Sequence, residues 1–428
     1  MIDLCLKNCK IVPGNLECSI GIDEGKIVSI TKVSPNSSEI IDIKGNPILP
    51  GLIDSHVHFR DPGLTYKEDF KTGSEAAAAG GFTTIMDMPN TKPPTVTKES
   101  FIEKLKIAQR KCYVDFALHA SAYDIKQIKP ISKLKPASFK IYMDFVDNGF
   151  LLETFEEISK LPQKTLISLH AEEKDIINYC TDDAKMEKIE NPSIYAKARP
   201  PIAENVATSI AISMALYFDL NIHICHLSTK STLKIIENAK KIGCKITSEI
   251  TPHHLFLDLS YLNKFGNYAK TNPPLRDHND KLQFSNLDNI DTIGTDHAPH
   301  TIKEKEYDLW EAPPGIPNLE TTLPLLLTKV NENKMSFEDI NRLLCQNPAE
   351  IFNIENKGKI AEGMDADIVV LDMKKEGIIN PENFKSKAKY SPFEGFNIKG
   401  MPILTMVRGN IVMNDGEIFE NKGYPIKK

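Results

Sequence analysis

Two histidines, His56 and His58, stand two residues apart in the apolar run LIDSHVHFR. Side chains two apart on an extended strand point to the same side, so these two imidazoles can bind one metal ion. Three further strand-like runs end in a metal-binding residue: TLISLH at His170, NIHICH at His226 and TIGTD at Asp296. Functional side chains of a parallel barrel lie where the strands end, so we expect these five to meet at one rim and form a metal centre. A single strand histidine is more often structural, but this many ligand types at strand ends favour the metal.

Lys140, in the run SFKIYM, ends the strand that precedes the His170 strand. An ammonium at this place would be repelled by the metal ions. A desolvated, neutral amine could instead react with carbon dioxide to form a carbamate, an oxygen ligand able to bridge two metals. A solvated lysine that follows a strand fits the spacing equally well, so the residues alone leave both alternatives open.

The elements that must position these residues alternate along the middle of the chain. Strand-like runs are separated by amphipathic or apolar helices, which we expect at 97–111, 151–160, 204–218 and 230–242. This alternation predicts an α/β fold with a parallel sheet and helical crossovers, long enough to close into a (β/α)8 TIM-like barrel. Both chain ends contain short strands broken by turns. We therefore expect residues 51–356 to form the catalytic barrel, and 1–50 with 357–428 to form one β-sandwich.

Composition excludes several classes of partner. The 52 Lys and Arg against 58 Asp and Glu give a net charge of −6, which offers no basic field for nucleic acid or a membrane surface. No signal peptide or apolar run of about 20 residues is present, so we expect a cytoplasmic protein.

The eight cysteines form no CxxC pair, which is typical of reduced thiols. Cys5 and Cys9 could share a metal, but no second pair completes such a site, and buried structural thiols fit better.

Several motifs carry a resemblance to a known family. HVHFRDPG, MPN, FKIYM, LHAEE, CHLST, TNPPLR and DHAPH, in this order and spacing, resemble the cyclic amidohydrolases, and within them the dihydroorotase family. The resemblance covers essentially the whole chain, because GKIAEGMDADIVVLD is similar to the family's return strand into its sandwich. It implies two zinc ions with these ligands: His56, His58 and Asp296 on one, His170 and His226 on the other, and carbamylated Lys140 bridging both. Some bacterial members have an aspartate in place of this lysine.

The resemblance also implies a reaction. It is the reversible cyclisation of N-carbamoyl-L-aspartate to L-dihydroorotate with loss of water, a step of pyrimidine (UMP) biosynthesis. Two zinc ions would lower the pKa of a shared water from about 15.7 toward ~7, which makes a zinc-bound hydroxide available as the nucleophile. Asp296 would act as general acid and base at the ring nitrogen. Beyond this small-molecule substrate, no partner is expected, and the sequence does not specify an oligomeric state.

Arg60 is the residue that bears on the substrate. It stands two residues beyond His58, shares its face, and offers a planar fork suited to a carboxylate. The resemblance adds Asn90 and His300 as carboxylate contacts and Asn272 as a contact to ring amide groups. Asn beside Pro favours turns whatever the ligand, so the residues alone favour a turn role for both asparagines.

A loop and a phenylalanine complete the predicted pocket. We interpret 301–320 as a loop over the substrate, with backbone contacts from Gly315, although an ordinary surface insertion fits its composition too. Hydantoinase-like relatives carry a tyrosine five residues after the lysine that assists the oxyanion. Here that position is Phe145, which cannot donate a hydrogen bond.

Two alternative functions compete with this interpretation. Another cyclic amidohydrolase, such as an allantoinase or dihydropyrimidinase, would handle a ring without a carboxylate, and Arg60 argues against it. A non-catalytic scaffold on the same fold would have lost metal ligands, whereas every ligand type is present here. The remaining histidines are interpreted as structural, and His223 is expected to point away from His226. They are His119, His223, His253, His254 and His278.

Overall fold

Parallel strands close into a barrel in the computed structural model, which describes residues 1–163, 165–187 and 191–428. The strands are β6 (Leu52–Val57), β7 (Phe82–Asp87), β8 (Asp115–Leu118), β9 (Ala120–Ser121), β10 (Phe139–Tyr142), β11 (Ile167–His170), β12 (Ile222–Ile224), β13 (Ile246–Ile250) and β14 (Thr292–Ile293). They pair as a three-stranded sheet, β6 to β8, and a six-stranded sheet, β9 to β14. Only His119 separates β8 from β9, and a parallel bridge joins Val57 to His297, so the two sheets form one closed barrel.

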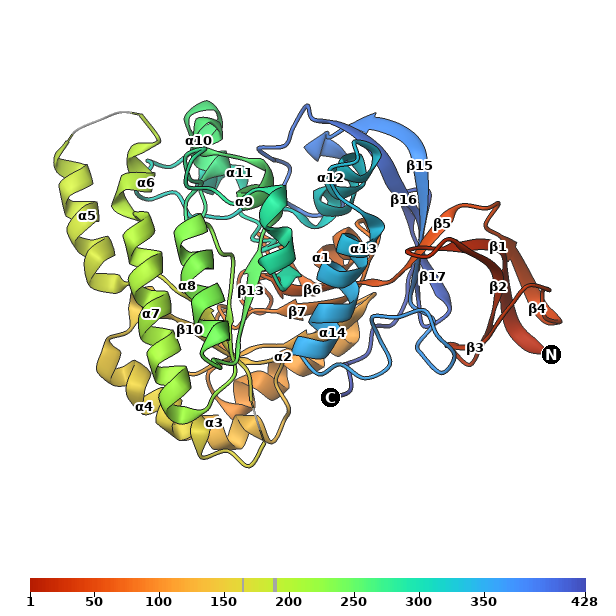
Figure 1. Cartoon of the computed structure of the whole chain (residues 1–428), viewed down its shortest axis with the longest axis horizontal. Helices are drawn as coiled ribbons and strands as arrows, with labels where there is room; N and C mark the ends of the chain where they lie inside the picture. Colours follow the sequence, from red (N-terminus) through yellow and green to blue (C-terminus); the bar gives the residue numbers. More distant parts are fainter. Residues whose placement is uncertain (164, 188–190) are drawn as a thin grey trace.

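Helices surround the barrel and connect its strands (Figure 1). The longer ones are α1 (Phe70–Ala79), α2 (Lys98–Lys111), α3 (Ile125–Ser132), α4 (Asn148–Ser159), α5 (Lys174–Met186), α7 (Pro201–Phe218), α8 (Lys230–Lys241) and α12 (Leu319–Asn331). The shorter ones are α6 (Ile194–Ala198), α9 (Pro252–Phe256), α10 (Leu259–Phe265), α11 (Ile302–Lys305), α13 (Phe337–Asn341) and α14 (Asn347–Ile351). The four predicted helices correspond to α2, α4, α7 and α8. Helix α7 begins three residues earlier than predicted, because Pro201 occupies its first turn, where a proline is well tolerated.

Both chain ends join in a second sheet beside the barrel. From the amino end come β1 (Ile2–Ile11), β2 (Leu16–Asp23), β3 (Lys26–Thr31), β4 (Ser37–Asp42) and β5 (Pro47–Pro50). From the carboxyl end come β15 (Ile368–Ile378), β16 (Asn397–Val407), β17 (Asn410–Asn414) and β18 (Glu417–Ile418). Strand β15 pairs antiparallel with β5, so the red and blue strands lie side by side in Figure 1. The expectation that the two ends form one β-sandwich around their own apolar core is confirmed.

Two stretches near the carboxyl end leave this sheet and lie on the barrel. In 379–396, the Tyr390 hydroxyl donates to the carbonyl of Gly315, and Ser386 donates to the buried carboxylate of Glu68. In the last eight residues, Pro425 forms a parallel bridge with Phe116 of β8. The domain limits at 50/51 and 356/357 therefore stay a prediction.

None of the described helices combines the length and the apolar composition needed to cross a membrane.

A buried cluster of charges fixes the sandwich to the barrel. The Lys357 side chain is 2 % exposed, and its ammonium lies 2.7 Å from an oxygen of Asp115 and 3.4 Å from one of Asp365 and also contacts Asp367. The Arg408 Nε lies 2.7 Å from the same Asp115 oxygen. Because Asp115 begins β8 while Arg408 follows β16, these ion pairs connect the two parts of the fold.

Replacing Lys357 tests this junction. Because Lys357→Met leaves three buried carboxylates with Arg408 as their one remaining cation in the cluster, we expect the free energy of unfolding to fall by about 3–5 kcal/mol in denaturant titrations. The matched variant Lys7→Met, which removes a half-exposed partner 3.4 Å from Asp42, is expected to cost about 1 kcal/mol or less. Equal losses in the two variants would contradict a structural role for the cluster.

Candidate active site

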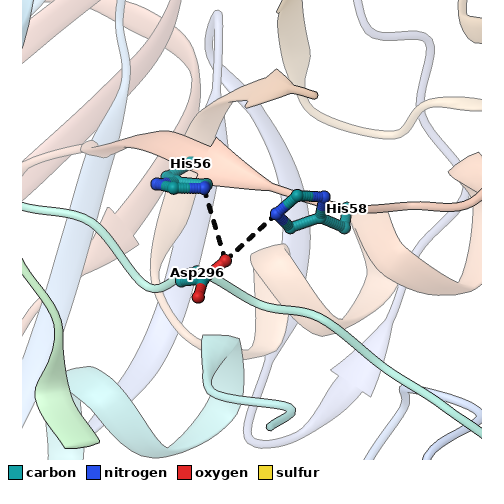
Figure 2. Close-up of side chains that lie close together, drawn as sticks. All are labelled: His56, His58 and Asp296. Atoms are coloured by element: carbon teal, nitrogen blue, oxygen red, sulfur yellow. Dashed lines mark hydrogen bonds and ion pairs between the residues drawn. The ribbon is translucent and has the colours of Figure 1, made fainter. Parts of the chain in front are cut away.

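His56, His58 and Asp296 converge at the carboxyl end of the barrel. His56 lies in β6, His58 directly follows it, and Asp296 follows β14, the neighbouring strand. The Asp296 Oδ1 lies 3.3 Å from His56 Nε2 and 3.0 Å from His58 Nε2 (Figure 2). All three are buried, and their donor atoms lie within 4.8 Å of one another. These distances fit three ligands of one metal ion.

The protonation pattern of these histidines also fits a cation. The other ring nitrogen of His56, Nδ1, lies 2.7 Å from the Glu249 carboxylate, which can only accept, so Nδ1 carries the proton. His58 Nδ1 likewise lies 2.7 Å from the amide oxygen of Asn90. Burial lowers the pKa of both imidazoles, which keeps them neutral. Each Nε2 therefore directs a lone pair at the Asp296 carboxylate, an arrangement that a metal ion between them would stabilise.

His170 and His226 form a second pair beside the first. His170 ends β11, and His226 follows β12 with a left-handed backbone (φ 38°). His170 Nδ1 lies 2.9 Å from His226 Nε2. His170 Nε2 lies 2.8 Å from Glu172, whose carboxylate also binds Arg199. Burial would raise the pKa of Glu172, but Arg199 and His170 hold that pKa well below its usual range.

Lys140 lies beneath the pocket surface, beside both histidine pairs. Its side chain is fully buried, and its Nζ lies 2.9 Å from the sulfur of Cys225. Within the described part of the chain, no carboxylate lies at ion-pair distance from this amine. A buried amine without an acidic partner fits a lysine that is modified, because carbamylation would convert it into an anionic oxygen ligand. A further group of donor atoms within 4.8 Å consists of His56, Cys225 and Glu249.

Three buried carboxylates that support the site were missed in the sequence. Glu249, in β13, accepts from His56 and from Ser55, whose hydroxyl lies 2.8 Å away. Gly294 lies so close that an added Cβ would stand 2.2 Å from the Glu249 carboxylate, so this position requires glycine. Asp54 accepts from the backbone amides of Thr295 and His56, and Glu172 orients His170. The available signal was position, since Glu249 lies near the end of a strand-like run and Glu172 lies two residues after His170.

The prediction for His223 was wrong. Its Nε2 lies 3.7 Å from Glu249 and its Nδ1 lies 2.8 Å from the Thr247 hydroxyl, so its side chain points into the barrel. The expected alternation fails because β12 ends at Ile224 and the left-handed backbone of His226 turns that side chain inward as well. The role stays structural, since His223 helps to hold the carboxylate that orients His56.

The two predicted metal sets face a pocket of about 240 Å³. Arg60 lines it and is buried, with 7 % of its surface exposed. Its Nε donates to the carbonyl of Pro299 at 3.4 Å, and an Nη lies 3.1 Å from His300 Nε2. Among the described residues, no carboxylate lies at ion-pair distance from Arg60. Because its charge has no ion-pair partner there, this buried guanidinium can bind an anionic group of a ligand in the pocket.

The other predicted contacts lie around the same pocket. Asn90, Asn272, His300 and Gly315 all line it. The Tyr195 hydroxyl donates to the Asn272 Oδ1 at 2.6 Å, which leaves the amide nitrogen of Asn272 to donate elsewhere. Both backbone polar groups of Gly315 are bonded within the chain, its N–H to the Lys270 carbonyl at 2.8 Å and its carbonyl to Tyr390. An added Cβ at Gly315 would stand 2.3 Å from the Ala298 carbonyl, so this loop lies against the β14 end of the barrel.

Two aromatic residues complete the pocket wall. Phe145 lines the pocket, with 69 % of its surface exposed. Tyr142 ends β10, and its buried hydroxyl has no hydrogen-bond partner among the described residues. Burial raises the pKa of Tyr142 well above its usual value, so the hydroxyl keeps its proton. Tyr142 was not among the predicted site residues, although it stands two residues after Lys140 and so shares its side of the strand.

Comparisons with known proteins agree with this site. The model of the amidohydrolase family matches residues 48–412. The chain is 48% identical to a dihydroorotase of Methanothermobacter thermautotrophicus, over 99% of this chain and 97% of the relative. It is 33% identical to an L-hydantoinase of Paenarthrobacter aurescens, over 99% and 97% of the two chains. Among solved structures, the L-hydantoinase (dihydropyrimidinase) from Arthrobacter aurescens superimposes with a TM-score of 0.95 at 32% identity and complete coverage of both chains.

Replacing Glu249 tests the metal centre. Glu249→Gln removes the carboxylate that fixes the His56 ring, and we expect the affinity for zinc to fall by roughly 10- to 100-fold. Competition with a chromophoric chelator would measure it. Glu320→Gln is the control, because this carboxylate accepts from the backbone amides of Lys385 and Ser386 and contacts no predicted ligand. An unchanged zinc affinity in Glu249→Gln would contradict the orientation described here.

Proposed function

The chain belongs to the amidohydrolase family, and on this premise we propose that it is a dihydroorotase, which interconverts N-carbamoyl-L-aspartate and L-dihydroorotate. Identity of 48% over nearly the full length of dihydroorotases from two organisms supports this function. The observation that carries it within the site is Arg60, a buried guanidinium that lines the pocket without an acidic partner among the described residues. An acidic ring supplies that partner, whereas a hydantoin or dihydropyrimidine ring does not.

Further charges around Arg60 favour an anionic ligand. His300 lies between Arg60 and Lys67, whose Nζ lies 3.1 Å from His300 Nδ1. Burial and these cations lower the pKa of His300 well below its usual value, so it adds no charge of its own. Glu304, 2.7 Å from Lys67, offsets part of this charge, and Asp296 and Asp87 act on Arg60 from beyond ion-pair distance. A carboxylate bound by Arg60, Asn90 and His300 would therefore meet a favourable potential.

The donor atoms present fit a pair of zinc ions. His56, His58 and Asp296 would hold one, His170 and His226 the other, with Lys140 as a carbamate between them. When bound, such ions act as Lewis acids that lower the pKa of water and polarise a carbonyl oxygen. The neutral imidazoles and the fully buried amine of Lys140 support this assignment.

Residues of the chain would carry out the proton transfer and hold the substrate. Asp296 accepts a proton from the attacking water and returns it to the ring nitrogen that leaves. Arg60 and Asn90 hold the carboxylate of the substrate. Asn272 donates from its amide nitrogen to a ring carbonyl, since Tyr195 occupies its oxygen. Gly315 and its loop close one side of the pocket.

The setting of the reaction is also part of the proposal. This reaction places the chain in pyrimidine biosynthesis, and we place it in the cytoplasm. All eight cysteines are free thiols, seven of them buried, which supports a reducing compartment.

The function is tested with the purified, zinc-loaded protein. We expect turnover of L-dihydroorotate and of N-carbamoyl-L-aspartate, followed by ultraviolet absorbance, and little turnover of dihydrouracil or allantoin. Removal of metal by a chelator should abolish the activity, and added zinc should restore it. Turnover of dihydrouracil or allantoin with none of dihydroorotate would assign the chain to another amidohydrolase activity.

Arg60 gives a sharper prediction. Arg60→Met removes the cation for the substrate carboxylate, and we expect KM for dihydroorotate to rise roughly 10- to 100-fold with a much smaller change in kcat. Steady-state kinetics on both substrates would measure this. Arg110→Met, at the exposed end of α2 and outside the pocket, should leave KM unchanged. A normal KM in Arg60→Met would remove the main argument for an acidic substrate.

A further inference from the structure

Two lysines bind the loop that lies over the pocket. Both side chains are buried. The Lys270 Nζ donates to the carbonyl of Leu309 at 2.6 Å and to that of Ala312 at 2.5 Å. The Lys305 Nζ donates to the carbonyl of Pro313 at 2.9 Å. Three backbone carbonyls of this loop are therefore bound by buried amines.

Neither amine has an ion-pair partner in the described part of the chain. Asp308 acts on Lys270, and Glu304 on Lys305, from beyond ion-pair distance. Burial lowers the pKa of both amines, that of Lys270 to about 8, but a neutral amine donates two hydrogen bonds as a charged one does. Because burying an amine costs free energy and a methionine would fill a similar space, the hydrogen bonds to the loop are what these amines contribute.

The loop has no regular structure of its own. Residues 306–315 form no helix or strand, and within the described chain the three bound carbonyls accept no other hydrogen bond. At the end of the loop, the Gly315 N–H donates to the Lys270 carbonyl at 2.8 Å, and the Gly315 carbonyl accepts from Tyr390. The position of the loop thus depends on side chains around it, among them Lys270 and Lys305.

The loop in turn orients His300. Burial keeps this imidazole neutral, and the Lys67 Nζ lies 3.1 Å from its Nδ1, so Nδ1 accepts and Nε2 carries the proton. Nε2 donates to the Pro314 carbonyl at 3.0 Å. This bond keeps the same edge of the ring 3.1 Å from a nitrogen of Arg60, where the substrate carboxylate is proposed to bind.

We infer that Lys270 and Lys305 are positioning residues for the carboxylate site, because they hold the loop in the place from which it orients His300. Lys305 binds the carbonyl of Pro313, and Pro314, the next residue, binds the imidazole. This inference deepens the proposed function and rests on it for the identity of the substrate. A displaced imidazole would weaken the binding of the ring before and during the reaction alike, so the effect falls on KM rather than on kcat.

The test is a double-mutant cycle between Lys305 and His300, with steady-state kinetics on dihydroorotate. We expect Lys305→Met to raise KM roughly 10-fold and to leave kcat within about threefold of wild type. Because the lysine acts through the imidazole, Lys305→Met should raise KM at most about twofold further in the His300→Ala background. Lys428→Met is the matched control with normal KM, since its amine also donates to two carbonyls, those of Pro136 and Ala137, outside the pocket.

The outcomes separate this inference from the proposed function. A normal KM in Lys305→Met, or KM factors that simply multiply in the double variant, would overturn the positioning role and leave the dihydroorotase function intact. If Lys305→Met does not fold, Lys270→Met decides in the same cycle, and failure of both variants to fold would make the lysines structural and overturn the inference. Absence of wild-type turnover of dihydroorotate would overturn the proposed function and this inference with it.

Discussion

The hydrogen bond between Glu249 and His56, 2.7 Å long, orders much of the site around it. The carboxylate fixes which nitrogen of His56 carries the proton, so the other nitrogen is free to face Asp296. The same carboxylate binds Ser55 and lies near His223, which connects the rim to the polar interior of the barrel. It also requires the absence of a side chain at Gly294. One buried charge on β13 thus constrains residues on three other strands or strand ends, β6, β12 and β14.

The predicted metal ligands could be located from the sequence because each stands at or next to the carboxyl end of a strand-like run. Parallel strands bring these ends to one rim of the barrel, so the position in the run is enough to expect the side chain there. Position alone placed Glu249 near a strand end and Glu172 two residues after His170, but it did not give their roles, because the partners His56 and Arg199 lie on other elements of the fold. The error at His223 has a related cause. Arg60, His226 and Asp296 adopt left-handed backbones (φ 62°, 38° and 46°). Because these residue types rarely adopt that conformation, the direction of their side chains could not be predicted from strand alternation.

The fold alone does not choose the substrate. A hydantoinase superimposes with a TM-score of 0.95, so the barrel and the sandwich are compatible with rings that differ in charge. This pocket holds a buried guanidinium without an acidic neighbour among the described residues, which suits a ring that carries a carboxylate. The charge that a substrate would meet is therefore set by residues at strand ends rather than by the core.

The crossing of segment 379–396 from the sandwich to the barrel has a consequence for how this architecture can evolve. Tyr390 binds the carbonyl of Gly315, and Ser386 binds Glu68, so part of the pocket wall is held by residues that follow the barrel in the chain. A barrel exchanged between relatives without this segment would lose a support of its own pocket. An exchange of the barrel would therefore have to include this segment, because a junction at the barrel's apparent end would separate the pocket loop around Gly315 from the residues that support it.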